Sequence, residues 1–146
     1  MPDDEHALSL DDYRTMAAFR CELRRFLAFS RAAANKASIP PQQYQALLAI
    51  KGHRGEDAIT IGELASELFI KQHTAVELAV RLEKAGLVEK SESTLDRRRV
   101  HLHLTAKAER ALESLAATHL EELRERGPFM AHLLTRMTFP SSDGEP

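Results

Sequence analysis

The sequence predicts a mainly α-helical fold with one small β-hairpin and with long helices near both ends of the chain. Three observations support this fold class. Apolar residues recur every three or four positions through long segments near each end, which is the period of an amphipathic helix. Two shorter helical segments follow each other closely in the middle of the chain. Two runs of β-forming residues then flank an arginine-rich stretch, which is the pattern of a hairpin.

The composition describes one soluble globular domain over residues 1–146. Hydrophobic residues make up 43% of the chain, and 20 lysines and arginines nearly balance 22 aspartates and glutamates, which excludes a disordered chain. One cysteine cannot form an internal disulfide, and no run of about 18 apolar residues is present to span a membrane. Because the acidic start Met1-Pro2-Asp3 also lacks the order of a signal peptide, we expect a cytoplasmic protein with no membrane partner.

The first two helices are predicted on either side of a proline pair. Residues 8–37 contain neither proline nor glycine, and the acidic Asp11 and Asp12 near their start agree with the direction of the helix dipole. Proline suits the first turn of a helix, so a second helix is expected from Pro41 to about Gly52.

A pair of short helices is predicted next. Thr60 and Glu63 have the spacing of a capping box, in which the hydroxyl and the carboxylate bond the unpaired amides at a helix start. We therefore expect one helix over residues 61–68 and, after a brief connection, a second over residues 74–85, which Gly86 ends. The result is two helices joined by a tight turn.

The hairpin is predicted directly after this pair. β-Forming residues over 87–91 and 100–104 indicate two strands, which a polar, arginine-rich tip joins. A short helix, a tight turn, a second helix and a hairpin with a basic tip form the element order of a winged helix-turn-helix. In that fold the second helix enters the major groove of DNA.

The last part of the chain is predicted to be helical up to a short tail. Thr105 can cap a helix whose apolar residues keep helical period until Gly127 and Pro128 end it. A final short helix should span residues 129–137, and the polar residues 139–146 are expected to form a flexible tail.

Several motifs of the central region resemble one family of regulators. They are Ile61-Gly62-Glu63-Leu64-Ala65, then Arg81-Leu82-Glu83 with Gly86-Leu87-Val88, then Asp96 with Arg98, and finally Leu104-Thr105. Their combined spacing is far more specific than any one of them. The chain is similar over nearly its full length to the MarR family of transcriptional regulators.

The resemblance implies a homodimer that binds double-stranded DNA with an inverted repeat. It gives residues 8–37 and 105–138 the role of dimerisation helices and makes residues 41–104 the winged helix-turn-helix lobe. It also implies a sequence-specific regulator, expected to be a repressor, whose DNA affinity a small-molecule effector changes. The identity of the effector and the residues of its pocket stay open.

Basic residues concentrate at the hairpin tip although the whole chain carries a formal charge of −2. Arg97, Arg98 and Arg99 follow one another there, and an arginine side chain fits the narrow minor groove, where the negative potential is enhanced. The resemblance gives Arg98 the role of the wing-tip arginine and Asp96 the role of positioning it. The alternative is that these arginines form an ordinary solvated turn.

The exposed start of the second helix of the pair is the predicted base-reading element. Glutamine can pair with adenine, threonine can touch a thymine methyl group, and lysine or arginine can hold phosphate or guanine. The predicted contacts from this helix are Lys71, Gln72, His73, Thr74 and Arg81. Lys71 departs from the family, in which a serine is common at this position. Glu77 is expected to pair with Arg81, four residues on, rather than to accept from a cytosine.

Three residues outside the predicted DNA contacts carry chemistry of their own. Cys21 lies in the first predicted helix, where some MarR relatives carry a peroxide-sensing cysteine, so it is a possible redox residue. The favoured interpretation of Cys21 is a small buried side chain. His101 and His103 face the same way on a strand, but no carboxylate or thiol joins them at ligand spacing, so no metal site is predicted.

No catalytic motif stands out in the sequence, which has no Gly-rich phosphate loop, HExxH or GxSxG pattern. We therefore expect neither an enzyme nor a cofactor. Two alternatives to a ligand-controlled DNA-binding regulator stay open. The net negative charge suits a winged-helix module that binds protein instead of DNA, and Cys21 suits a regulator that thiol oxidation controls.

Overall fold

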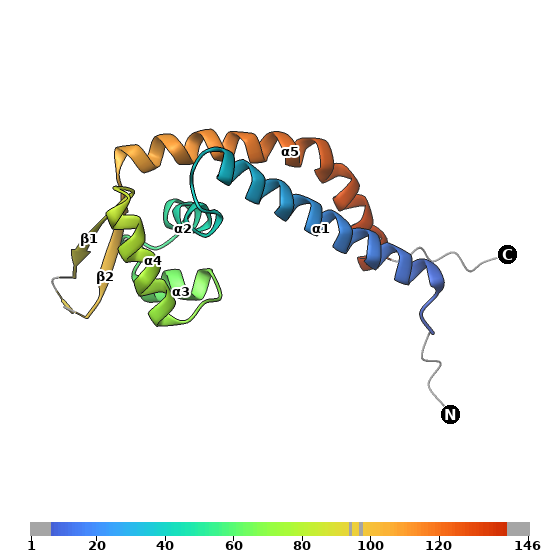
Figure 1. Cartoon of the computed structure of the whole chain (residues 1–146). Helices are drawn as coiled ribbons and strands as arrows, with labels where there is room; N and C mark the ends of the chain where they lie inside the picture. Colours follow the sequence, from blue (N-terminus) through green and yellow to red (C-terminus); the bar gives the residue numbers. More distant parts are fainter. Residues whose placement is uncertain (1–6, 94, 97, 140–146) are drawn as a thin grey trace, which may run out of the picture. The chain divides into compact units, whose positions relative to one another are not determined.

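The structure is a computed structural model of the chain, and it describes residues 7–93, 95, 96 and 98–139 (Figure 1). The predicted mainly α-helical fold with one hairpin is confirmed. The elements are α1 (Leu10–Lys36), α2 (Pro41–Lys51), α3 (Ile61–Glu67), α4 (Gln72–Lys84), β1 (Val88–Glu92), β2 (Val100–Leu104) and α5 (Ala106–Thr138). Two predictions lie outside the described residues, namely Arg97 as a DNA contact and residues 140–146 as part of a flexible tail.

The chain divides into two compact units. The winged unit covers Arg31–Thr118 and contains the end of α1, all of α2, α3, α4, β1 and β2, and the start of α5. The helical unit combines Met1–Ser30 with His119–Pro146 and contains the remaining parts of α1 and α5. None of the described helices is both long enough and apolar enough to cross a membrane.

A shared apolar core holds the winged unit together. The core joins α2, α3, α4 and β2 to the segment before α3. Its largest fully buried side chains are Leu47, Ile59, Leu64, Leu78, Leu82 and Leu102. Burial of one such aliphatic side chain stabilises the folded state by about 1.5–3 kcal/mol, so this core fixes the helix pair against the hairpin.

The starts of α3 and α4 are built differently. At α3 the predicted capping box is present: Thr60 Oγ1 accepts from the Glu63 amide at 3.1 Å, and Glu63 Oε1 accepts from the Thr60 amide at 3.1 Å. At α4 the helix begins at Gln72, two residues before the predicted start. Lys71 takes the extended N-cap conformation without a side-chain cap bond, so the sequence carries no capping signal there.

The hairpin is fixed to the helix pair at its base. β1 and β2 are antiparallel, with Val88 opposite Leu104. Gly86 has a φ of +72°, a left-handed conformation that lets the chain turn from α4 into β1. On the other side of the hairpin, the Leu102 amide donates to the Ile59 carbonyl at 2.9 Å. β2 therefore pairs both with β1 and with the segment before α3.

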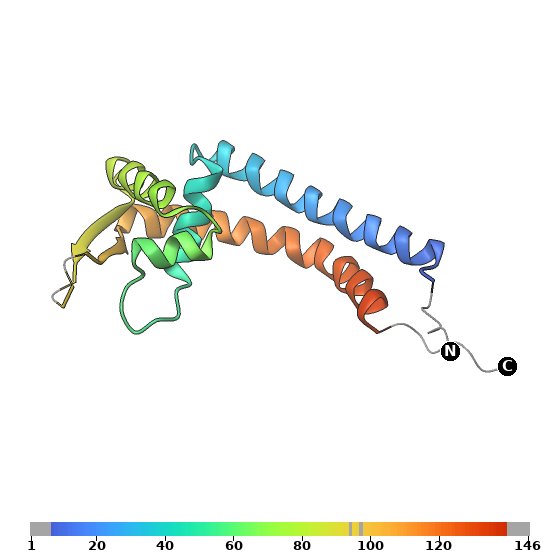
Figure 2. The same cartoon turned by 90° about the horizontal axis from the view of Figure 1, so that it is seen from below.

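In the helical unit, α1 and α5 run antiparallel and lie side by side in both views (Figures 1 and 2). Three polar contacts join them along their length. They are Ser30 with His119 at 2.8 Å, Glu22 with Arg126 at 3.4 Å, and Asp11 with Arg136. Their order shows the antiparallel direction, because residue numbers rise on one helix as they fall on the other.

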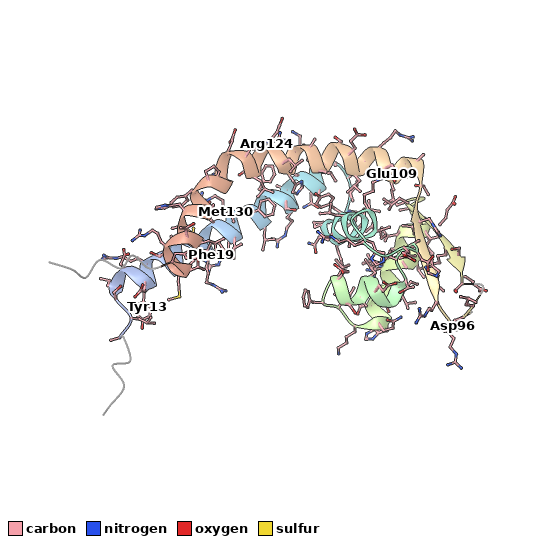
Figure 3. The ribbon with its side chains drawn as sticks, turned by 180° about the vertical axis from the view of Figure 1, so that it is seen from behind. Tyr13, Phe19, Asp96, Glu109, Arg124 and Met130 are labelled. Atoms are coloured by element: carbon pink, nitrogen blue, oxygen red, sulfur yellow. The ribbon has the colours of Figure 1, made fainter. Side chains whose placement is uncertain are left out.

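The predicted helix end at Gly127 and Pro128 and the separate helix over residues 129–137 are wrong, because α5 continues unbroken. A proline inside a helix removes one backbone hydrogen bond and crowds the carbonyl four residues earlier, which bends the helix without ending it. α5 changes direction between Arg124 and Met130 (Figure 3). The contacts with α1 lie on both sides of the proline, so packing against α1 carries the helix across it.

Candidate nucleic-acid interface

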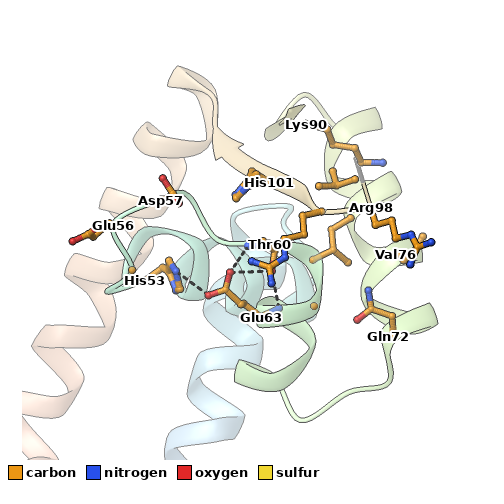
Figure 4. A pocket seen from close by; sticks show the side chains of 15 residues that line it. His53, Glu56, Asp57, Thr60, Glu63, Gln72, Val76, Lys90, Arg98 and His101 are labelled. Atoms are coloured by element: carbon orange, nitrogen blue, oxygen red, sulfur yellow. Dashed lines mark hydrogen bonds and ion pairs between the residues drawn. The ribbon is translucent and has the colours of Figure 1, made fainter. Parts of the chain in front are cut away.

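A hollow of about 900 Å³ opens in the winged unit between α4, the hairpin and the loop before α3 (Figure 4). We call it the groove. Gln72 and Val76 of α4 and Lys90, Arg98 and Arg99 of the hairpin line one part of it. The loop before α3 and α3 itself contribute His53, Glu56, Asp57 and Glu63. One wall of the groove is therefore cationic, whereas the opposite wall carries carboxylates and an imidazole.

The first turn of α4 presents its predicted contact residues in different ways. Gln72 lines the groove, Lys71 and His73 are exposed, and Thr74 is half-buried. The Gln72 side chain reaches toward α3, where its Oε1 lies 3.5 Å from the point that a Cβ on Gly62 would occupy. The Gln72 amide therefore lies next to the surface of α3 at Gly62.

Further along α4, the exposed face differs from the prediction at two residues. Val76 is 41% exposed and lines the groove. Sequence reasoning missed it, because an apolar residue at helical spacing indicates core. Arg81 is exposed as expected, but within the described residues no ion pair joins it to Glu77, so the predicted intrahelical pair is absent. Both side chains are available to solvent.

The wing tip is organised by Asp96 through backbone hydrogen bonds. Asp96 Oδ1 accepts from the Arg98 amide at 2.9 Å, and the Asp96 carbonyl accepts from the Arg99 amide at 3.0 Å. The Ser93 amide donates to the Arg99 carbonyl at 3.0 Å and closes the turn. Asp96 is labelled at this tip in Figure 3. The carboxylate thus holds the turn that presents Arg98, and the Arg98 and Arg99 side chains are exposed.

Lys90 links the hairpin to α4. Its Nζ lies 3.7 Å from Glu83 Oε1, and its side chain is half-buried on the groove wall. A partly exposed salt bridge of this kind adds little stability by itself. It does keep the Lys90 charge inside the groove, between β1 and α4.

Glu63 is the most connected charged residue of the opposite wall. Besides its capping bonds, its carboxylate accepts from the Thr60 hydroxyl at 2.9 Å and lies 3.3 Å from His53 Nε2. Burial raises the pKa of Glu63, but the bonds from Thr60 and the positive charges of His53 and Arg99 lower it by more, so the pKa lies below the ordinary 4.5. Arg99 and Glu63 line the same groove. The sequence indicated Glu63 as a cap and gave no sign of its contact with His53.

The two strand histidines hold separate partners. His101 Nδ1 lies 2.6 Å from the Ala58 carbonyl oxygen, so this nitrogen carries the proton, because a carbonyl only accepts. His103 Nε2 lies 2.8 Å from Ser91 Oγ. Across the part of the chain that the structure describes, no group of three or more histidine, cysteine, aspartate or glutamate residues is arranged to hold a metal ion.

Cys21 is exposed on α1, which differs from the buried side chain that the sequence favoured. The apolar spacing of this helix does not show which side α5 covers. The Cys21 sulfur lies 4.0 Å from Nη2 of Arg25 and far in sequence from the groove residues.

Comparisons with known proteins show which regulators this chain is similar to. Residues 37–99 match the sequence model of the MarR family. An uncharacterised HTH-type transcriptional regulator of Bacillus subtilis, YsmB, is 34% identical over 67 residues, which are 46% of this chain and 46% of that protein. The HTH-type transcriptional regulator FarR of Neisseria gonorrhoeae is 33% identical over 102 residues, 70% of this chain and 65% of that protein. The chain thus spans about half to two thirds of these relatives.

Solved structures share the fold at low sequence identity. MepR, a transcription regulator of a Staphylococcus aureus multidrug efflux pump, has a TM-score of 0.71 at 20% identity, covering 83% of this chain and 93% of that one. A MepR mutant bound to an oligodeoxyribonucleotide has a TM-score of 0.64 at 21% identity, covering 84% and 94%. CouR of Rhodococcus jostii bound to p-coumaroyl-CoA has a TM-score of 0.65 at 17% identity, covering 92% and 98%.

Proposed function

Since this chain belongs to the MarR family through its winged helix-turn-helix, we propose that it is a homodimeric, sequence-specific DNA-binding repressor of the cytoplasm. A small-molecule ligand controls its affinity for DNA. Its DNA site is an inverted repeat, of which each chain contacts one half.

The groove is the observation that supports this proposal. It places the start of α4, with Gln72, beside three cations of the hairpin. A helix start with a glutamine amide suits the major groove, and an exposed arginine on a hairpin suits the neighbouring minor groove. The cations lie in one place although the chain as a whole is net negative, with a formal charge of −2. Such local charge provides the phosphate contacts that DNA binding needs.

The helical unit supports the homodimer. Apolar side chains of α1 and of the last part of α5 are exposed on the single chain, and a second copy would bury them. They are Leu10, Tyr13, Met16, Leu23 and Leu27 on α1 and Leu120, Leu123, Phe129 and Leu134 on α5. Pairing of identical helices by a two-fold axis also matches the two-fold symmetry of an inverted repeat.

Ligand control would act through the spacing of the two α4 helices of the dimer. These helices must reach successive major grooves about 34 Å apart, so a ligand that favours another spacing lowers DNA occupancy. A hundredfold loss of affinity requires the ligand to favour the non-binding state by about 3 kcal/mol. Binding of p-coumaroyl-CoA by CouR supports a small-molecule partner.

Selection of duplexes from a random pool by the purified chain tests the proposal. We expect enrichment of one inverted repeat and binding by two chains per duplex. The logarithm of the affinity should fall with the logarithm of salt concentration by about 0.9 per phosphate neutralised, and Arg98→Ala should reduce this slope by about that amount per chain. Absence of salt-dependent binding at low ionic strength contradicts the proposal and favours a module that binds protein.

A further inference from the structure

The carboxylate of Glu63 works against DNA binding in the groove. It lines the same hollow as Arg98 and Arg99, so an approaching phosphate meets a negative charge beside the cations. The α3 start nevertheless needs this side chain, because Glu63 closes the capping box with Thr60. A positive charge next to Glu63 would let this residue cap α3 without repelling a phosphate in the groove.

His53 is placed to supply that charge. Its Nε2 lies 3.3 Å from Glu63 Oε2, and 15% of its side chain is exposed (Figure 4). The absence of a side chain at Gly55 leaves room for this ring, since a Cβ on Gly55 would lie 2.4 Å from His53 Nε2. Histidine is the side chain whose charge changes most readily between acidic and neutral pH, so this contact suits a charge that depends on pH.

Other charged groups also face His53 in the winged unit. The acidic ones besides Glu63 are Glu56 and Asp57 of its own loop and Glu109 of α5, which pairs with Lys51 of α2 at 2.9 Å. The cationic ones are Lys51 of α2 and Lys90, Arg98 and Arg99 of the hairpin. Two further histidines of β2 lie near His53, because His101 lines the groove with it and His103 lines a smaller neighbouring hollow with it. A variant of His53 alone separates its contribution from theirs.

We propose that His53 is a positioning residue of the DNA-binding groove, whose protonated ring neutralises Glu63 and so lowers the negative charge that a phosphate meets beside Arg98 and Arg99. DNA binding is then coupled to proton uptake at His53. The duplex is held more tightly as the pH falls through the titration of this ring. The inference rests on the proposed DNA-binding function and adds a pH dependence to it.

Binding of the selected duplex between about pH 5.5 and pH 8.5 at constant ionic strength tests the inference. Fluorescence anisotropy gives the affinity of the unmodified chain, His53→Gln, His53→Lys and Gly55→Ala. Gln can still donate to Glu63 but does not titrate, and Lys keeps a permanent charge. Gly55→Ala retains the histidine but displaces its ring. His132→Gln on α5, where His132 is exposed, is the matched control.

We expect His53→Gln and Gly55→Ala to weaken binding about fivefold at the acidic end and to have little effect at the basic end. His53→Lys should restore tight binding at every pH. Glu63→Gln retains a capping-box side chain, and in that background His53→Gln should have no further effect. Circular dichroism checks that each variant is folded.

The results separate this inference from the function on which it rests. If the chain binds duplex and the pH profile of His53→Gln equals that of the unmodified chain, His53 has no positioning role. His53 also has no positioning role if His53→Gln changes the DNA affinity by the same factor in the unmodified chain and in the Glu63→Gln variant. A folded chain that binds no duplex at any pH contradicts the proposed function and the inference together.

Discussion

The carboxylate of Asp96 accepts a hydrogen bond from the backbone amide of Arg98 at 2.9 Å, so an acidic residue shapes the most basic part of the chain. An aspartate that bonds the amide two residues on is a common way to stabilise a tight turn. Here the turn determines where the Arg98 side chain points. The acidic residue therefore acts on DNA binding indirectly, through the backbone.

Asp96→Ala should weaken duplex binding by about fivefold, which corresponds to about 1 kcal/mol for one exposed hydrogen bond. Without the acceptor, the Arg98 amide loses its partner and the tip samples more conformations. Asp96→Asn keeps the oxygen acceptor and removes the charge, so it should bind at least as tightly as the unmodified chain. Anisotropy titrations measure both affinities. Equal weakening by alanine and asparagine would show that the charge matters and the turn does not.

The size of the side chain at position 62 should limit how far Gln72 reaches into the groove. A Cβ at Gly62 meets Gln72 Oε1 at the ordinary contact distance of 3.5 Å, so Gly62→Ala should leave DNA binding unchanged. It should also stabilise α3 by up to about 1 kcal/mol, because alanine favours helix more than glycine does. Gly62→Leu should displace the Gln72 amide and weaken binding as much as Gln72→Ala.

The double variant Gly62→Leu with Gln72→Ala provides the control for this pair. If both substitutions act by removing the same contact, the double variant should bind as weakly as either single one. Additive losses in the anisotropy titrations would mean that leucine at position 62 disturbs the groove in another way. Thermal unfolding by circular dichroism measures the expected stabilisation by Gly62→Ala.

The features of the fold that the sequence predicts correctly depend on interactions between residues close together in the chain. The Thr60 and Glu63 capping box and the Gly86 turn depend on neighbours within a few residues, so their signals are present in the sequence itself. The continuation of α5 through Pro128 depends on contacts with α1, which lie about a hundred residues away in the chain. Periodicity predicts each helix alone and does not contain such contacts.

The candidate site likewise has features that the sequence predicts and features that depend on contacts between distant residues. A basic hairpin tip and the start of α4 are visible as residue types in order, and the structure brings Gln72, Arg98 and Arg99 to one groove. The contact between His53 and Glu63 joins a loop to a helix start, and no spacing rule connects these two residues. The exposure of Cys21 depends on the side of α1 that faces α5, which the helical period leaves undetermined.

Glu63 should make the stability of the chain depend on pH in the acidic range. Its pKa in the folded chain lies below the ordinary value of 4.5. The stabilisation is therefore complete above about pH 4.5 and is lost as the pH falls through the folded pKa. Glu63→Gln should be less stable than the unmodified chain at about pH 6, and the difference should shrink at about pH 3.

Urea unfolding at both pH values measures this difference as the shift in the midpoint. Glu67→Gln, at the other end of α3, is the matched control, because Glu67 is exposed and takes no part in the capping box. A midpoint difference between Glu63→Gln and the unmodified chain that stays constant from about pH 6 to about pH 3 would contradict the assignment.

Leu27 provides a test of the homodimer and of its link to DNA binding. It is 56% exposed on α1 in the single chain, and burying it in a dimer would stabilise association by up to about 1.5 kcal/mol per chain. Leu27→Glu places a charge in that interface and should shift the chain toward monomer, whereas Leu27→Met keeps an apolar side chain of similar volume and should leave the dimer intact. Sedimentation velocity measures the proportions of monomer and dimer.

The same variant tests the link between the dimer and DNA binding. Because a monomer holds only one half-site, Leu27→Glu should lose most of its affinity for the inverted repeat while retaining the same affinity for an isolated half-site. Undiminished dimer in Leu27→Glu would place the self-association surface elsewhere on the chain.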